Sequence, residues 1–262
     1  MREVEADLAL LVGAAREAGV LARRYWKRRP KVWEKPGDAG PVTEADIAVN
    51  RLLETRLRAA RPGYGWLSEE SDDSAARLGA ERVFIIDPID GTRAFIAGED
   101  AFAHSLAVAE AGRVIAGVVY LPALDRLYSA SADGPARLGG VPIHASGTGK
   151  LEGSRMLVTR PNLAPGFWPG GVPDLKRSFR PSIAYRLCLV AEGRHDGLIM
   201  MRDTWEWDIA AGGLIAERAG AAVTDRHGTR LAFNAPRPMT EGVLAAPPVL
   251  HRGLMDRLRP GG

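Results

Sequence analysis

The sequence predicts an α/β protein of layered helices and strands, with an N-terminal α+β lobe (residues 1–150) and a C-terminal α/β lobe (residues 151–262). The chain has 262 residues, 46% of them hydrophobic and 26% charged, which is typical of a globular protein with a large core. Residues 102–130 contain β-rich stretches separated by turn residues, which indicates a meander. From about residue 155, short apolar strands alternate with helical stretches, and this change of pattern suggests a second lobe.

The expected helices of the first lobe are marked by their ends. A first amphipathic helix covers about residues 3–27 and closes before Pro30, because proline cannot continue a helix. A Gly- and Pro-rich loop then leads to Thr43, whose spacing to Asp46 resembles a capping box. We expect the second helix to begin there and to run to about Ala60.

The strand pattern begins with an apolar run at residues 82–86, which we expect to end sharply at Asp87-Pro88. The remaining expected elements are strands at 105–110, 113–121 and 126–131, then 156–160, a helical stretch at about 183–193, 197–201, a helix at about 208–219, 221–225 and 243–247.

Charge and cysteine usage exclude several classes of protein. Thirty-five basic and 32 acidic residues leave a net charge of +3 and are too evenly interspersed for a nucleic-acid-binding stripe. The single cysteine, Cys188, excludes an intrachain disulfide and a multi-cysteine zinc site. No apolar run approaches the ~20 residues that span a bilayer, and the charged N-terminus does not resemble a signal peptide. We therefore expect a cytoplasmic protein with neither nucleic acid nor membrane as a partner.

Acidic residues at the end of the first apolar strand are the strongest sign of chemistry. Asp87 and Asp90 flank Pro88, and Gly91 permits a backbone conformation that other residues resist. Carboxylates that converge at such a bend repel each other unless a cation neutralises them. Oxygen ligands without His or Cys favour Mg²⁺ or Mn²⁺ over zinc.

Each acidic motif also has a structural interpretation. Asp208 stands where it could cap a helix, and Asp87-Pro-Ile-Asp-Gly-Thr could be no more than a turn. Glu69 and Glu70 could lie in a solvated loop. The motifs therefore have to be considered together.

In combination, these motifs resemble the inositol monophosphatase superfamily of Mg²⁺-dependent, lithium-sensitive phosphomonoesterases. The resemblance extends over about residues 5–250 and implies an alternating α/β/α/β/α sandwich of two lobes with phosphoric monoester hydrolase activity. DPIDGT followed far downstream by WDIAAG is a highly specific pair. The matching elements, in the order of the family, are Val42-Thr43-Glu44-Ala45-Asp46, Leu67-Ser68-Glu69-Glu70-Ser71, Ile86-Asp87-Pro88-Ile89-Asp90-Gly91-Thr92 and Glu206-Trp207-Asp208-Ile209-Ala210-Ala211-Gly212.

The resemblance also implies the site residues. Two or three Mg²⁺ ions, for which Mn²⁺ could substitute, would activate water for in-line displacement at phosphorus. The implied metal ligands are Glu70, Asp87, the Ile89 carbonyl, Asp90 and Asp208, with Asp46 near a third, weaker ion.

The same resemblance assigns the catalytic and phosphate-binding groups. Glu70 and Thr92 would orient the attacking water, and Asp46 would accept a hydrogen bond from Thr92. The backbone N–H groups of Gly91 and Thr92, together with Lys35 and Asp208, would face the phosphate.

The resemblance implies a small phosphate ester as the substrate, and the residues around the metal motifs favour a 3'(2'),5'-bisphosphate nucleotide such as adenosine 3',5'-bisphosphate. Arg93-Ala-Phe-Ile and residues 188–193 resemble bisphosphate nucleotidases, and Arg93 and Arg186 could each bind a second phosphate bidentately. Met201 replaces a glutamate that commonly binds inositol hydroxyls in inositol monophosphatases. However, residues 182–186 depart from the nucleotidase pattern, which leaves inositol 1-phosphate and histidinol phosphate as alternatives.

Two further questions stay open at the level of the sequence. A catalytically silent binding protein of the same fold is the non-enzyme alternative; loss of a metal carboxylate would be its mark, and none is lost. The family often dimerises through the first lobe, so the sequence also leaves a homodimer open.

Overall fold

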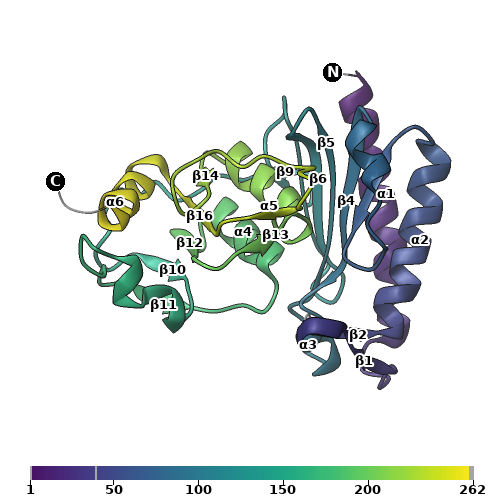
Figure 1. Ribbon diagram of the computed structural model, residues 1–262, viewed down its shortest axis with the longest axis horizontal. Coiled ribbons are helices and arrows are strands. Elements are labelled where there is room, and N and C mark those ends of the chain that lie inside the picture. Colours follow the sequence, from purple (N-terminus) through teal and green to yellow (C-terminus); the bar gives the residue numbers. More distant parts are fainter. Residues whose placement is uncertain (1, 39, 260–262) are drawn as a thin grey trace.

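The computed structural model describes residues 2–38 and 40–259, so residues 1, 39 and 260–262 of the two expected lobes lie outside the description. Helices and sheets alternate in five layers, as Figure 1 shows. The layers are helices α1 (Arg2–Tyr25) and α2 (Glu44–Ala60), a seven-stranded sheet, helices α4 (Ile183–Ala191) and α5 (Glu206–Arg218), a five-stranded sheet, and helix α6 (Pro248–Leu258). The α/β/α/β/α sandwich that the sequence predicts is confirmed.

The seven-stranded sheet contains its strands in chain order. Its first two strands are parallel and every later neighbour is antiparallel, so the predicted meander is also confirmed. The strands are β3 (Gly65–Ser68), β4 (Arg82–Asp90), β5 (Ala103–Glu110), β6 (Arg113–Leu121), β7 (Arg126–Ser131), β8 (Arg137–Leu138) and β9 (Val141–Pro142).

The five-stranded sheet has the mixed order β11-β10-β12-β16-β14. Its strands are β10 (Arg155–Leu157), β11 (Lys176–Ser178), β12 (Gly197–Met200), β14 (Ala222–Thr224) and β16 (Val243–Ala246). The smaller elements are the hairpin of β1 (Val32–Glu34) and β2 (Pro41–Thr43), helix α3 (Thr92–Ile96), the pair β13 (Thr204–Trp205) and β15 (Met239–Thr240), and the 3₁₀ turns η1 (Pro36–Asp38), η2 (Ala75–Gly79), η3 (Arg160–Leu163) and η4 (Pro165–Phe167).

Strand β4 does not end at Asp87-Pro88, and this corrects the sequence prediction. Asp87 pairs with Ser105 and Asp90 pairs with Ala103, so three steps along β4 face two steps along β5. The extra residue forms a β-bulge, which accommodates a proline that has no N–H to donate to the ladder. Both aspartates therefore belong to a strand that continues through the bend.

The hydrophobic core between the two sheets takes side chains from both halves of the chain. Helices α4 and α5 fill this layer, and Ile85, Leu187 and Ala211 are all fully buried in one cluster. The contact is close: a Cβ atom at Gly117 of β6 would lie 3.0 Å from the Cα atom of Ala211 in α5. The division into lobes near residue 150 stays a prediction, since the two halves share this core.

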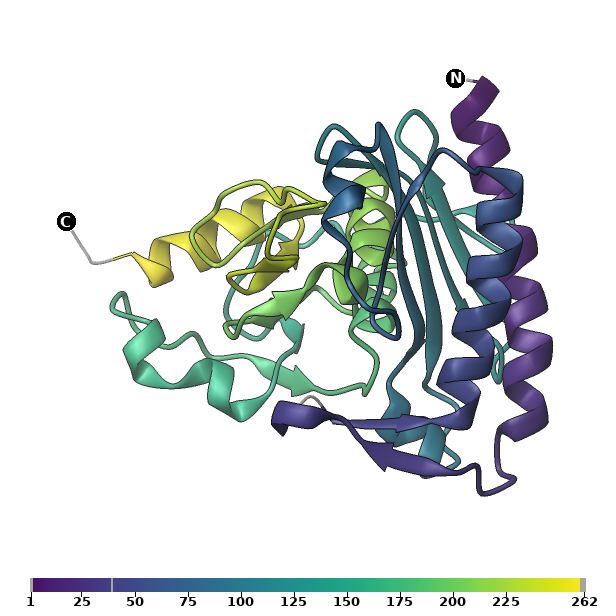
Figure 2. The same cartoon turned by 45° about the vertical axis from the view of Figure 1, so that its right-hand side comes forward.

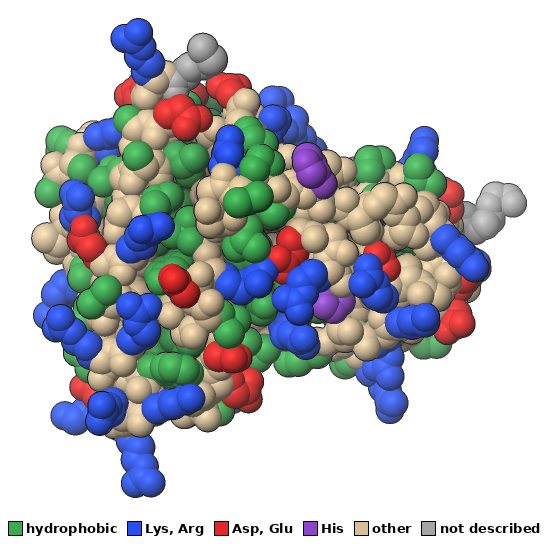
Figure 3. Space-filling model, turned by 180° about the vertical axis from the view of Figure 1, so that it is seen from behind, with side chains coloured by type: hydrophobic (Ala, Val, Ile, Leu, Met, Phe, Trp, Pro, Cys, Tyr) green, Lys and Arg blue, Asp and Glu red, His purple; other side chains and the backbone are tan. Residues whose placement is uncertain are grey.

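The surface carries both signs of charge. On the face that Figure 3 shows, Lys and Arg side chains are spread among Asp and Glu side chains. Among residues 2–38 and 40–259, no helix has the combination of length and hydrophobicity required to cross a membrane.

Candidate active site

The acidic motifs meet at one end of the seven-stranded sheet. The hairpin of β1 and β2 and the short helix α3 lie side by side there in both ribbon views (Figures 1 and 2). A cavity of about 1040 Å³ opens at this place and is lined by Glu69, Asp90, Thr92 and Asp208, among others. The loop after β3 supplies Glu69, the end of β4 supplies Asp90, the start of α3 supplies Thr92, and the first turn of α5 supplies Asp208.

Three carboxylates form a cluster that could hold a metal ion. Asp87, Asp90 and Asp208 each offer an oxygen, and these three oxygens lie within 4.8 Å of one another. The bulge in β4 brings the first two together, and α5 supplies the third from the other half of the chain. Asp87 and Asp90 are only 1% and 6% exposed, so bulk water does little to screen their charges.

The electrostatics of the cluster fit a divalent cation. Burial and then the charges of neighbouring carboxylates raise the pKa of Asp87 and Asp208, and burial raises the pKa of Asp90 to about 6. Asp87 Oδ1 has no hydrogen-bond partner within the described part of the chain. Buried carboxylates that repel one another, one of them with an unused oxygen, are the donor set that a hard cation requires.

Asp208 is not the N-cap of its helix, which corrects the structural interpretation of this residue. Helix α5 begins at Glu206 and Trp205 occupies the cap position. Asp208 therefore lies in the first turn, where the helix dipole favours a negative charge, and it lines the cavity.

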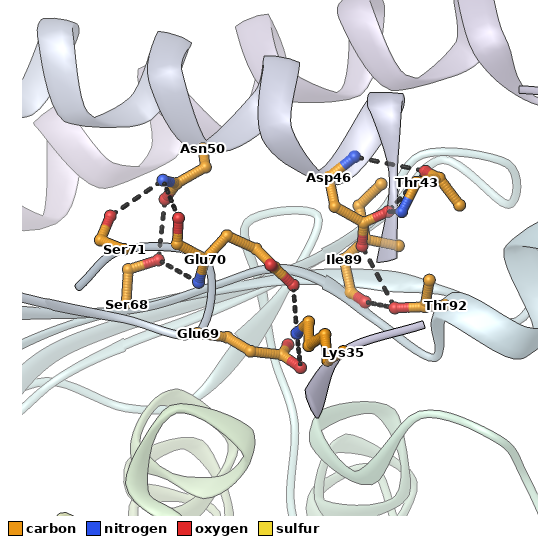
Figure 4. Close-up of polar contacts among 10 residues, drawn as sticks. All are labelled: Lys35, Thr43, Asp46, Asn50, Ser68, Glu69, Glu70, Ser71, Ile89 and Thr92. Atoms are coloured by element: carbon orange, nitrogen blue, oxygen red, sulfur yellow. Dashed lines mark hydrogen bonds and ion pairs between the residues drawn. The ribbon is translucent and has the colours of Figure 1, made fainter. Parts of the chain in front are cut away.

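Asp46 serves the helix and the site with different oxygens. Its Oδ2 accepts a hydrogen bond of 2.8 Å from the Thr43 N–H, which completes the predicted capping box of α2. Its Oδ1 lies 3.2 Å from the hydroxyl of Thr92, and that hydroxyl also lies 3.0 Å from the Ile89 carbonyl (Figure 4). Burial raises the pKa of Asp46 to about 6.

Glu69 and Glu70 are neighbours in sequence with different surroundings. Both contact Lys35 of the hairpin loop, at 2.7 Å and 2.5 Å (Figure 4). Glu69 lines the cavity, and its charge contributes to the raised pKa of both Asp87 and Asp208. Burial, and then the charge of Glu69, raise the pKa of Glu70 to about 7, and its backbone carbonyl accepts a hydrogen bond from Asn50.

Glu69 is the acidic residue that sequence reasoning did not assign to the site. The structure places it with the carboxylate cluster, whereas the role implied for Glu70 stays a prediction. Strand β3 ends at Ser68, and the direction of the two following side chains depends on the turn that the backbone makes there. The sequence carries no local signal for that turn.

Gly91 connects β4 to α3 in a backbone conformation that few other residues adopt. Its φ of +94° lies in the left-handed region, and a Cβ atom would lie 3.3 Å from the Ala101 carbonyl oxygen. Gly91 and Thr92 both line the cavity, and the contact of their N–H groups with a phosphate stays a prediction.

Guanidinium groups surround the cavity on several sides. Arg93, which the sequence predicts as a substrate contact, is exposed and lines the cavity. Four further arginines line it that sequence reasoning did not single out, because they lie on loops and at strand ends without a motif: Arg126, Arg180, Arg194 and Arg202. Arg126 is paired with Glu192, and Arg194 lies 3.7 Å from the same carboxylate.

Arg186 and Met201 lie elsewhere than a substrate role would suggest. Arg186 is 5% exposed, and its guanidinium donates to the carbonyls of Arg180 and Pro181. Burial lowers its pKa to about 10. Met201 is 1% exposed within the cluster beneath α6, and it is the adjacent Arg202 that lines the cavity.

Known proteins are similar to this chain in sequence and in fold. Residues 3–260 match the sequence model of the inositol monophosphatase family. An inositol-1-monophosphatase from Mesorhizobium japonicum is 33% identical over 235 residues, which cover 84% of this chain and 86% of that protein. A 3'(2'),5'-bisphosphate nucleotidase from Salmonella typhimurium is 31% identical over 223 residues, covering 84% and 90% of the two chains.

The likeness extends to three dimensions. The solved structure of an IMPase from Thermotoga maritima has a TM-score of 0.81 with this protein at 28% identity and covers 98% of this chain and 97% of that one. Sequence, fold and carboxylate cluster agree, and we conclude that the chain belongs to the inositol monophosphatase family and is a phosphoric monoester hydrolase.

Proposed function

We propose that the protein is a Mg²⁺-dependent phosphomonoesterase whose preferred substrate carries a second phosphate, with a 3'(2'),5'-bisphosphate nucleotide as the first candidate. The observation that carries this proposal is the pairing of an acidic floor with a basic wall in one cavity. All five residues line the same cavity: we call the carboxylates of Asp90 and Asp208 the acidic floor and the guanidinium groups of Arg93, Arg180 and Arg202 the basic wall.

The acidic floor would hold the metal ions. Asp87, Asp90 and Asp208 are the first ligands, and Glu69 is the glutamate best placed to join them. Mg²⁺ bound there would polarise the phosphate ester and acidify an attacking water. Mn²⁺ accepts the same oxygen donors and is the expected substitute.

Thr92 and Asp46 supply a route for a proton. The single hydroxyl proton of Thr92 can be donated either to the Ile89 carbonyl or to Asp46 Oδ1, at 3.0 Å and 3.2 Å. Asp46 has a raised pKa of about 6, so its carboxylate can accept a proton near neutral pH. Thr92 also lines the cavity in which the ester would bind.

The basic wall distinguishes between substrates. Among the described residues, no carboxylate lies within 4.0 Å of the guanidinium nitrogens of Arg93, Arg180 or Arg202, so the charges of these three arginines remain for a ligand. A guanidinium binds phosphate through two parallel hydrogen bonds, whereas the neutral hydroxyls of inositol gain less from it.

Inositol 1-phosphate is the second candidate. It is favoured by the identity of 33% to an inositol-1-monophosphatase, which slightly exceeds the identity of 31% to the nucleotidase. The metal cluster would serve either ester, so the choice depends on the residues of the wall.

We further infer a reducing, cytoplasmic setting. Cys188 is the single cysteine and is fully buried in the shared core, where burial raises the pKa of its thiol. A small soluble phosphate ester is the expected partner, and a homodimer is compatible with this role.

The test is a phosphate-release assay of the purified protein with Mg²⁺. Adenosine 3',5'-bisphosphate, inositol 1-phosphate and histidinol phosphate are compared at equal concentration, each with and without excess chelator and with Li⁺. We expect kcat/KM for the bisphosphate to exceed that for inositol 1-phosphate by about tenfold, which corresponds to ~1.4 kcal/mol. Full activity in excess chelator would contradict the metal assignment, and a preference for inositol 1-phosphate would replace the first candidate by the second.

A further inference from the structure

His104 lies in β5 directly opposite the bulge of β4. It is the residue between Ala103, which pairs with Asp90, and Ser105, which pairs with Asp87. Its side chain is completely buried, and its Nδ1 lies 2.5 Å from the carbonyl oxygen of Pro88. A histidine therefore contacts the backbone of the segment that carries two of the clustered carboxylates.

The contact with a carbonyl oxygen determines which nitrogen of the His104 ring carries a proton. A carbonyl oxygen can only accept a hydrogen bond, so Nδ1 must carry the proton. Nε2 is buried without a hydrogen-bond partner among the described residues. The ring lies between aromatic neighbours, with centroids 6.5 Å from Phe102 and 6.4 Å from Tyr120. Within residues 2–38 and 40–259 the imidazole thus makes one polar contact, with Pro88.

The bulge leaves the Pro88 carbonyl in need of such a donor. Proline has no N–H, and the residues between Asp87 and Asp90 have no regular partner in β5. A buried carbonyl without a donor is costly, so the segment would otherwise rotate to find one. On the next peptide, the Thr92 hydroxyl lies 3.0 Å from the Ile89 carbonyl. His104 and Thr92 therefore contact consecutive carbonyls of the same bend.

We propose that His104 is a positioning residue that holds the bulge of β4 in the conformation in which Asp87 and Asp90 converge on a metal ion. It acts through the Pro88 carbonyl and touches neither substrate nor metal. This inference rests on the proposed function, because it assumes that the carboxylate cluster binds Mg²⁺ or Mn²⁺.

The test measures metal binding directly in three variants of the full chain. His104→Asn can place an amide N–H near the position of Nδ1, whereas His104→Gln extends the amide beyond it, and His104→Leu has no donor. Mn²⁺ is titrated into each metal-free protein, and the free ion is measured by its electron paramagnetic resonance signal. Groups that orient metal ligands typically contribute 10- to 100-fold to affinity, and His104 would orient Asp87 and Asp90 through the Pro88 backbone. We therefore expect the Kd for Mn²⁺ to rise about tenfold or more in the Leu and Gln variants and to stay within about threefold in the Asn variant.

His251→Leu is the matched control. His251 is also a buried histidine with one polar partner, Thr224 at 2.8 Å, but it lies in α6. We expect it to lower the melting temperature without changing the Kd for Mn²⁺. If wild-type protein binds no Mn²⁺, the proposed metal site is wrong. If wild-type protein binds Mn²⁺ and all three His104 variants bind it equally well, or if Asn and Gln weaken it equally, the metal site stands and the positioning role is wrong.

Discussion

The hydroxyl of Ser182 lies 2.6 Å from Oδ2 of Asp90, although the two residues are 92 positions apart in the chain. The same carboxylate oxygen accepts a hydrogen bond of 2.7 Å from the Ala184 N–H. Ser182 is also the N-cap of α4, where its hydroxyl oxygen accepts from the Tyr185 N–H. One side chain thus caps a helix of the second half and orients a carboxylate of the first.

Ser182→Ala is expected to affect both roles. Loss of the cap costs about 1 kcal/mol of stability, and loss of the donor lets Asp90 rotate, so the Mg²⁺ concentration for half-maximal activity should rise roughly tenfold. Phosphate release at increasing Mg²⁺ measures the second effect. Ser74→Ala is the control, because Ser74 caps η2 away from the carboxylate cluster. An unchanged Mg²⁺ requirement in the Ser182 variant would show that this residue only caps the helix.

Asp90→Asn and Asp208→Asn should each lower kcat by about 100-fold or more. The amide keeps the shape of the side chain but supplies no charge to a metal ion, and about 100-fold corresponds to ~2.7 kcal/mol. In chelator, both variants should melt at a higher temperature than wild type, because one of the repelling charges is gone. The exposed Asp133→Asn serves as the control for both measurements. Near wild-type turnover at saturating Mg²⁺ would remove that aspartate from the site.

The contribution of the carboxylate cluster to the stability of the metal-free protein should decrease as pH rises from about 4 to about 7. The pKa of Asp90 is raised from 3.8 to about 6 in the folded state, so protonation stabilises the fold. This contribution is fully present below the unfolded pKa and is lost as pH rises through the folded pKa; Asp87 and Asp208 shift in the same direction. The measurement is the melting temperature in chelator at several pH values. The decrease of the melting temperature with rising pH should be smaller in Asp90→Asn than in wild type. If the melting temperature of Asp90→Asn depends on pH as steeply as that of wild type, Asp90 is not the source of the pH dependence.

Glu69 and Glu70 can be separated by paired substitutions. Both side chains contact Lys35, but Glu69→Gln changes a group that lines the cavity beside the aspartates, whereas Glu70 does not line that cavity. We expect the Mg²⁺ concentration for half-maximal activity to rise about tenfold in the first variant and by less than threefold in the second. Both variants replace a carboxylate that contacts Lys35 by an amide of the same shape, so each controls for the other. A larger effect at Glu70 would return the metal-ligand role to that residue.

Arg93→Ala should change the choice of substrate. The exposed guanidinium lines the cavity, and a charge-assisted contact to a second phosphate contributes ~1.5 to 3 kcal/mol. We expect kcat/KM for adenosine 3',5'-bisphosphate to fall about tenfold while that for inositol 1-phosphate changes little. Arg58→Ala, on the outer face of α2, is the control. An equal loss for both substrates would show that Arg93 binds the phosphate that is hydrolysed.

Local sequence signals were sufficient where a local cause decides the structure. The Thr43 capping box, the left-handed Gly91 and the meander that follows depend on neighbours within a few residues, and all three appear as predicted. The end of the strand at Asp87-Pro88 was predicted wrongly, because the signal of proline alone does not show that β5 offers His104 opposite a bulge.

The sequence by itself determined the family, the layered fold and the acidic residues that form the cluster, because motif spacing and hydrophobic period are properties of the linear chain. Only the tertiary structure decided which of two adjacent glutamates lines the cavity and which arginines surround it. It also placed Arg186 against backbone carbonyls and Met201 in the core. The physical reason is that the direction of these side chains is set by the packing of α4, α5 and the two sheets against one another, through contacts between residues far apart in the chain.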